Sequence, residues 1–452
     1  MLNATLYTIF RETERMKRRA FGYRPAKLAI ALGAALMAAG PAHADEFSEA
    51  TGLADLMAGK GDAQPLKDFG VTWGGWLNFG VTYNAESPAG KFNGPVTFGD
   101  RSSELQMNQF YLYLERAVNT EGNEWDFGGR FDFMLGTDAI FTQAYGAPQG
   151  HWDLRLWNQR FLGIALPQAY AEIFAPVGNG LTVKIGHFYT IIGNEVVTAP
   201  DNFFYSHAYT MQYGEPFTHT GVLLSYPFDQ NWSVTGGVVT GSETGGWDGG
   251  FDKGLGNWNG IGGVTWTSDD KGTSVFVSGT TGATSETNNN NFSIYSIVIN
   301  HDIMEGLHYT FQHDHGFAGK AVVRNGHALD ATWYGINQYI TYDIQDDLAI
   351  GIRGEWFRDD DGFRVFSPGR TLSLIDPVVD PVTGEGLNSP SSYYAVTLGL
   401  NWKPLKWVMV RPNVRYDWSD KAKAYDNGGG STDYAGTKTS QFLFSTDVVI
   451  TF

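Results

Sequence analysis

Two short clusters in this sequence contain side chains that could bind a metal ion. His313 and His315 flank Asp314 and would share one face of a strand, and residues 358–362 read RDDDG. Zinc sites take three or four ligands, and calcium loops space several acidic residues ahead of a distal Glu. Neither cluster meets these requirements. We therefore expect solvated loop histidines at 313–315, no bound metal and no cofactor.

The sequence gives little support for catalysis by a serine or cysteine nucleophile. The chain has no cysteine, which excludes thiolate chemistry and disulfides, and it has no Gly-x-Ser-x-Gly element. Ser206 stands beside His207, but adjacent residues of a strand point to opposite faces. We predict that the protein is not an enzyme and keep a hydrolase as an alternative.

A third group of candidate functional residues consists of charged residues that alternate with apolar ones along the chain. In 125–135 the odd positions carry Trp, Phe and Leu, whereas Asp126, Arg130 and Asp132 occupy even positions; 348–357, 393–402, 407–418 and 441–452 alternate in the same way. The charged phase is predicted to face an aqueous interior, where it either creates a transverse field or forms internal pairs that fill the space. The predicted pore-lining residues are Asp126, Arg130, Asp132, Glu172, Lys184, Arg353, Glu355, Arg411, Arg415 and Asp417.

The composition favours short strands and tight turns. The 452 residues include 57 Gly, 22 Tyr, 30 Phe and 14 Trp but only 17% charged residues. The formal net charge of −17 repels nucleic acid, which excludes DNA and RNA as partners.

The N-terminal region has the pattern of a secretory signal peptide. Basic residues between Lys17 and Lys27 precede an apolar run at 28–39 and the Ala42-His43-Ala44 site. That run is too short for a bilayer, which needs about 20 apolar residues. We predict a signal peptide at 1–44, with Met16 as an alternative start, and a periplasmic N-terminal lead at 45–69.

The elements that must position the charged residues are strands. No apolar stretch after residue 44 is long enough for a membrane helix, so a membrane-spanning chain must form a closed barrel. We predict an all-β fold at 70–452: a transmembrane up-and-down antiparallel β-barrel of about 16 strands (14 to 18), with short periplasmic turns and long extracellular loops. The predicted strands are 71–83, 104–116, 124–136, 167–176, 181–192, 217–227, 231–240, 257–267, 273–281, 291–301, 306–314, 329–342, 347–357, 392–402, 407–418 and 440–452.

Four stretches resemble the OmpL-like β-barrel porin family, known from planctomycetes and related bacteria. They are 125–139, 166–172, 183–226 and 410–417, and the similarity extends from about 70 to 452. The resemblance implies an outer-membrane barrel that conducts solutes, with no catalytic residues to transfer. Phe452, at the end of an alternating strand, is similar to the signal read by the outer-membrane assembly machinery.

The third long connection, 193–216, is rich in aromatic residues. A loop this apolar would expose a large patch if it extended into water. We predict that it narrows the lumen; a cap over the outer mouth and a subunit contact are the alternatives. The predicted constriction residues are Phe203, Phe204, Tyr205, Tyr209 and Tyr213.

These observations predict a porin of the outer membrane of a Gram-negative-type cell, a water-filled channel for passive diffusion of small hydrophilic solutes. Its expected partners are outer-membrane lipid, small hydrophilic solutes or ions and the assembly machinery, with a homotrimer expected by analogy. A non-conducting structural or adhesion barrel and a secreted carbohydrate-binding sandwich remain alternatives.

Overall fold

The computed structural model describes residues 69–88, 91–143, 153, 156, 158–159, 162–240, 258–283, 291–324, 326–365, 390–426 and 437–452. The predicted signal peptide and, except for Phe69, the predicted N-terminal lead lie outside these residues. Among the helices that are described, none combines the length and the apolar character needed to cross a membrane.

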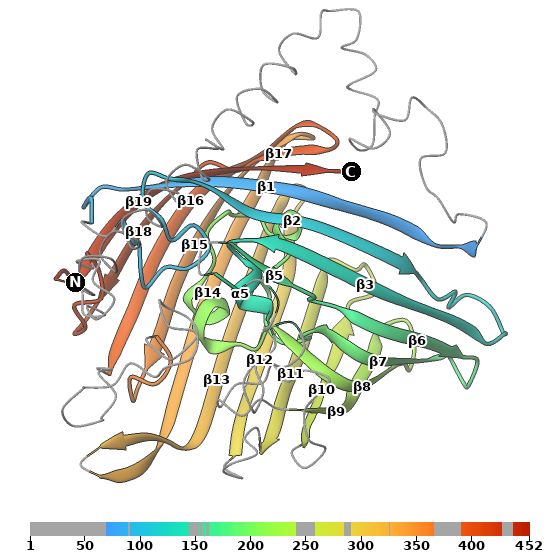
Figure 1. The fold of residues 1–452 in the computed structure, drawn as a ribbon. Coiled ribbons are helices and arrows are strands. Elements are labelled where there is room, and N and C mark those ends of the chain that lie inside the picture. Colours follow the sequence, from blue (N-terminus) through green and yellow to red (C-terminus); the bar gives the residue numbers. More distant parts are fainter. Residues whose placement is uncertain are drawn as a thin grey trace, which may run out of the picture. The chain divides into compact units, whose positions relative to one another are not determined.

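Antiparallel strands make up most of the described chain (Figure 1). They are β1 (Thr72–Asn84), β2 (Leu105–Arg116), β3 (Asp126–Gly136), β4 (Asn158–Gln159), β5 (Leu162–Ala165), β6 (Ala169–Ala175), β7 (Leu181–Tyr189), β8 (Thr218–Pro227), β9 (Trp232–Thr240), β10 (Trp258–Thr267), β11 (Thr273–Ala283), β12 (Asn291–Met304), β13 (Leu307–Arg324), β14 (His327–Gln345), β15 (Leu348–Asp359), β16 (Ser391–Leu405), β17 (Val408–Val410), β18 (Asn413–Ser419) and β19 (Ser440–Thr451). Each pairs with its neighbours, and β19 pairs with β1 from Trp76–Thr451 to Asn84–Leu443, which closes the sheet.

Two pairs of these segments are single strands interrupted by a break, and one further segment is a short addition. The remaining count is the sixteen strands that the sequence predicts. β5 and β6 lie end to end beside β3, and β17 and β18 lie end to end beside β19. The first break contains Pro167 and the second Pro412, and proline has no N–H to donate to a ladder. The two-residue β4 pairs with β5 as a small addition. The predicted all-β barrel of sixteen strands is confirmed.

Two predicted connections are partly wrong. Residues 315–328 are not a loop, because β13 and β14 continue as a hairpin to the Arg324–His327 pair. The inward and outward alternation also continues there, with Phe317 exposed and Ala318 buried. Within 137–166, the structure forms a short helix, α5 (Ala139–Thr142), and the strands β4 and β5.

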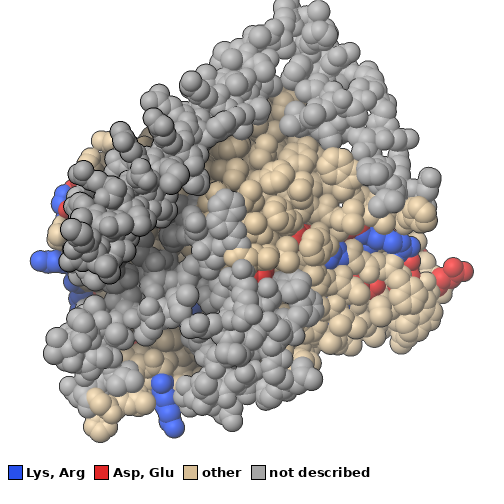
Figure 2. All heavy atoms as spheres, viewed as in Figure 1, with Lys and Arg blue, Asp and Glu red and all other residues tan. Residues whose placement is uncertain are grey.

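Along each strand, side chains alternate between the two faces of the sheet, and the polar side chains face the interior of the barrel. On β3, Phe127 and Phe131 are 59% and 47% exposed, whereas Asp132 is fully buried. On β18, Tyr416 is exposed between the buried Arg415 and Asp417. The space-filling view shows an outer wall of mostly uncharged residues, with charged atoms in scattered places (Figure 2). An apolar exterior around a polar interior is the arrangement of a barrel surrounded by lipid.

Candidate functional site: the inner segment and its anchors

Residues 190–217, which connect β7 to β8, form what we term the inner segment. It contains a 3-10 turn, η3 (Ala199–Asp201), and a π-helical turn, η4 (Thr210–Gly214). Tyr209 and Tyr213 have no exposed surface, which is unusual for a connection between strands. Its hydrogen bonds reach β2, β13, β14, β15 and β18, and strands so far apart around a barrel share only the interior. The inner segment therefore lies inside the barrel.

Three buried arginines, the arginine anchors Arg353, Arg411 and Arg415, attach the inner segment to the wall. Arg353 Nη1 donates to Glu195 Oε1 and to the carbonyl of Ser206, at 2.7 and 2.6 Å. The two Nη1 bonds of Arg411, both 2.7 Å, reach the carbonyls of Ala199 and Asn202.

The third anchor, Arg415, donates from Nη1 to the carbonyl of His207 at 2.9 Å. Its Nη1 also contacts Glu355 Oε1 at 2.8 Å, and its Nε contacts Asp417 Oδ1 at 2.8 Å. Glu355 in turn accepts a bond from Arg353 Nε and one from the backbone N–H of Tyr209. Buried charges are stable only when paired, and here wall and segment supply each other's partners.

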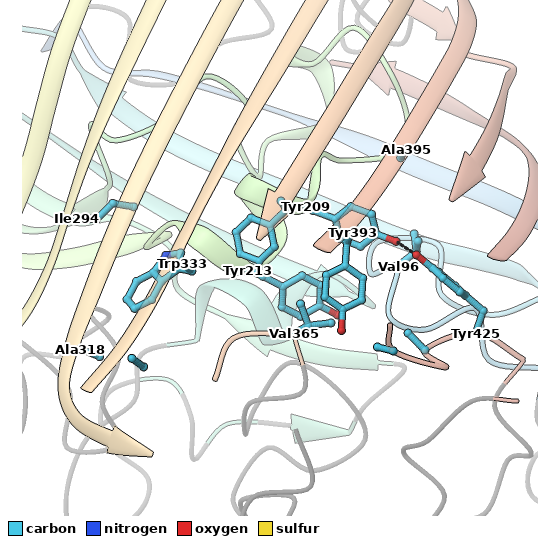
Figure 3. Close-up of a cluster of buried hydrophobic side chains, with 14 of the residues drawn as sticks. Val96, Tyr209, Tyr213, Ile294, Ala318, Trp333, Val365, Tyr393, Ala395 and Tyr425 are labelled. Atoms are coloured by element: carbon cyan, nitrogen blue, oxygen red, sulfur yellow. Dashed lines mark hydrogen bonds between the residues drawn. The ribbon is translucent and has the colours of Figure 1, made fainter. Parts of the chain in front are cut away.

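Aromatic side chains complete the attachment. The hydroxyl of Tyr205 donates to Asn108 Oδ1 at 3.0 Å, and that of Tyr209 donates to Asp417 Oδ1 at 2.9 Å. The hydroxyl of Tyr213 donates to the carbonyl of Pro95. Figure 3 shows Tyr209 and Tyr213 in a cluster with Trp333, Val365 and Tyr393, and the cluster joins the segment to the wall.

Three glycines of the barrel wall make room for aromatic rings of the inner segment. A Cβ atom on Gly80 would lie 2.8 Å or less from ring atoms and the hydroxyl of Tyr205, and one on Gly351 would lie 2.5 Å from the Phe203 ring. Phe204 lies 3.0 Å from the Cβ position of Gly399. The five predicted constriction residues therefore lie in the interior, and Phe203, Phe204 and Tyr205 pack against wall glycines.

Burial and pairing set the ionisation of two groups in the segment. Burial opposes the charge of Glu195, but Arg353 and His207 outweigh it and hold the pKa of Glu195 well below its ordinary value. Burial lowers the pKa of His207 by more than its hydrogen bond with Glu195 raises it. At neutral pH we therefore expect a charged carboxylate beside a neutral imidazole.

The ten predicted pore-lining residues divide into two groups. Arg353, Glu355, Arg411, Arg415 and Asp417 lie against the inner segment. The other five, Asp126, Arg130, Asp132, Glu172 and Lys184, lie on β3, β6 and β7. In this second group Arg130 contacts Asp132 at 2.8 Å and Glu115 at 3.3 Å. Glu172 stands opposite Lys184 in the β6–β7 ladder.

The other candidates for chemistry have local partners. Ser206 Oγ accepts a bond from Arg353 Nη2 at 3.1 Å, and His207 Nδ1 contacts Glu195 rather than the serine. His313 is not in a loop: it lies in β13, with Nδ1 3.0 Å from the carbonyl of Gly335. Asp359 accepts the backbone N–H groups of residues 363–365. No three His, Asp or Glu side chains converge as a metal-binding group in the described parts of the chain.

Two anchoring residues are absent from the sequence prediction. Asp447 pairs with Arg411 and falls in the buried phase of β19, so the alternation used elsewhere could have identified it. Glu195 lies in an irregular connection, and no local pattern connects it with Arg353, 158 positions away.

Solved structures of outer-membrane proteins have the same fold. The outer membrane channel DcaP of Acinetobacter baumannii aligns with 84% of this chain and 97% of its own, at 10% identity and a TM-score of 0.52. An anion-selective porin from Comamonas acidovorans aligns with 84% of this chain and 99% of its own, at 11% identity and a TM-score of 0.53. The trimer form of OmpT of Vibrio cholerae aligns with 84% of this chain and 99% of its own, at 10% identity and a TM-score of 0.50.

No curated protein matches the chain in sequence. The family model described as "Putative beta-barrel porin-2, OmpL-like" matches residues 70–452, which comprise the whole barrel. This match, together with the closed barrel and its apolar exterior, shows that the chain belongs to this family of β-barrel porins and is a channel protein of the outer membrane.

Proposed function

We propose that the chain is a passive diffusion channel whose width is set by the inner segment. The observation that carries this proposal is the set of arginine anchors, which hold a connection of 28 residues inside the barrel. A connection fixed by buried ion pairs narrows the lumen permanently rather than closing it intermittently.

In this proposal the charged residues have two roles. Arg353, Arg411 and Arg415 position the inner segment, since their guanidinium groups are occupied by it and by neighbouring acids. The group on β3, β6 and β7 supplies the charges that a passing ion meets, because Arg130 and Lys184 are only partly buried. Substitutions in this second group should therefore change ion preference more than width.

The experiment that tests the proposal compares single-channel conductance with and without the inner segment. A variant in which residues 196–213 are replaced by a four-residue Gly-Ser turn should show a clearly larger conductance than the unaltered protein in the same bilayer. The heat-dependent mobility shift on a denaturing gel, a property of folded barrels, serves as the folding control. An equal or smaller conductance from a folded variant would show that the segment is not the constriction.

Assembly is a separate proposal. We infer that the barrel forms a homotrimer, supported by the similarity of its fold to the trimer form of OmpT. We also propose that Phe452, whose backbone exchanges two hydrogen bonds with Gly75, is read by the assembly machinery. Cross-linking in detergent should give a trimer band, and removal of Phe452 should reduce the amount of barrel that reaches the outer membrane.

A further inference from the structure

Two buried carboxyl groups meet near the end of the inner segment. Glu215 directly follows the π-helical turn η4, and Asp314 lies in β13. Both residues are buried, with at most 1% of their surface exposed. A single nitrogen, Nε2 of Gln312, donates to Glu215 Oε1 at 2.6 Å and to Asp314 Oδ2 at 2.9 Å. Because one nitrogen bonds both groups, the two carboxyls lie side by side.

No cation compensates this pair in the described part of the chain. None of the Lys, Arg and His side chains described there forms an ion pair with either carboxyl. Arg353 pairs with acids of the inner segment and of β15, Arg364 donates to the backbone of the inner segment, and His313 contacts the backbone of β14. The nearby charge of Glu195 adds to the repulsion. Two adjacent carboxylates in a dry site repel each other, so one of the two groups should hold a proton.

The position of Glu215 suits it to hold this proton. Asp314 Oδ1 is a buried acceptor that has no hydrogen-bond donor among the described residues. A protonated Glu215 would be a donor beside the Asp314 carboxylate. Burial, followed by the charge of Asp314, raises the pKa of Glu215 well above its ordinary value of 4.5. Glu215 therefore keeps its proton at pH values at which an exposed glutamic acid has lost it.

The carboxyl pair belongs to the attachment of the inner segment to β13 and β14. Trp333 Nε1, in β14, donates to the carbonyl of Gly214 at 3.0 Å. Asn337 Nδ2, in the same strand, donates to Thr210 Oγ1. The arginine anchors bond the segment earlier, within residues 195–207. The bond between the segment and β13 therefore depends on the carboxyl pair rather than on the anchors.

We propose that Glu215 and Asp314 form a pH-dependent latch, which fixes residues 210–217 to β13 while the pair holds a proton and releases them when that proton passes to water. The inference rests on the proposed channel function and adds its regulation. The latch is closed at low pH and opens as the pH rises, because two carboxylates then face each other without a cation. Arginine stays protonated at every working pH, so the anchors keep the earlier part of the segment in place. The lumen should therefore widen at high pH without losing its constriction.

Single-channel recording at a series of pH values tests the latch. With the unaltered protein we expect a narrow conductance state at about pH 5 and a wider state whose occupancy grows towards about pH 9, since deprotonation favours the released segment. The ratio of wide to narrow occupancy should rise by up to about tenfold per pH unit, the limit for the release of one proton.

Glu215→Gln should keep the latch closed. The amide has nearly the shape of the carboxyl, carries no charge and can donate to Asp314 at every pH. This variant should stay in the narrow state across the whole pH range, and Asp314→Asn should behave in the same way. His313→Gln is the matched control, because His313 is the adjacent titratable residue of β13. It should keep the pH response of the unaltered protein. The heat-dependent mobility shift shows that each variant is folded.

A pH response that both amide variants leave unchanged would overturn the latch while the channel function stands. So would the loss of the response in His313→Gln, or a conductance of the unaltered protein that does not change with pH. A folded protein that conducts no current at any pH would overturn the channel function and the latch together.

Discussion

The guanidinium of Arg353 in β15 donates a hydrogen bond of 2.7 Å to the carboxylate of Glu195 in the inner segment. Both side chains are buried, and Arg353 has no exposed side-chain surface. This ion pair joins a wall strand to a connection that a porin could otherwise extend over its outer mouth. The position of the inner segment therefore depends on charges that are stable only together.

Substitution of Arg353 by methionine should release part of the inner segment. It leaves Glu195 and the buried Glu355 short of a partner, a change that costs about 3 to 5 kcal/mol. The released segment should become sensitive to chymotrypsin at its Phe and Tyr residues, and the open-channel current should fluctuate more. Arg358→Met, on the same strand, is the control because the acid paired with Arg358, Asp360, is exposed. Equal protease resistance in both variants would rule out the anchoring role.

Substitution of Gly80 by alanine should displace the Tyr205 ring. The new methyl group would lie within 2.3 Å of ring and hydroxyl atoms that are held by the bond to Asn108. We expect a destabilisation of about 1 to 3 kcal/mol, as for other overpacked sites. It should appear as a lower unfolding temperature in detergent. Gly354→Ala, where a Cβ meets nothing within 4 Å, should have little effect; an equal loss in both variants would argue against the close packing.

The stability of the barrel should depend on pH through Asp138, which lies between β3 and α5. Burial raises the pKa of Asp138 from 3.8 to about 7, against the opposing effect of bonds from Gln109 and Asn108. The folded state thus favours the protonated carboxyl, and stability should fall as the pH rises from about 4 to about 7. Asp138→Asn should reduce the difference in unfolding temperature between pH 5 and pH 8. If the difference persists unchanged, the pH dependence has another origin.

A positive charge on the outer face should impair insertion into lipid. Ile352 is exposed beside the inward Arg353, so Ile352→Arg would place a guanidinium against the hydrocarbon at a cost of about 2 to 4 kcal/mol. The refolding yield into vesicles should fall. Asp346→Arg, in the turn between β14 and β15, is the control and should refold normally. Normal refolding of Ile352→Arg would contradict the membrane-facing assignment.

The barrel could be predicted from the sequence because strand alternation is a local property. Phe127, Asp132, Arg415 and Tyr416 each face the side that their position in the alternation predicts. Strand ends were harder to predict, since β13 continues past His315 by pairing with β14, and pairing is not local.

The anchors of the inner segment could be predicted only in part. Arg353 and Arg411 are recognisable as inward residues, but their acceptors Glu195 and the carbonyl of Ala199 depend on how a long connection folds back. No short-range pattern encodes such a contact.

Single-channel recording of the unaltered protein in a planar bilayer tests the central claim most directly. An open barrel narrowed by a fixed inner segment predicts discrete, long-lived current steps in potassium chloride that are smaller than those of the protein with residues 196–213 replaced. A protein that shows the mobility shift of a folded barrel but conducts no current would contradict the claim that it is a diffusion channel.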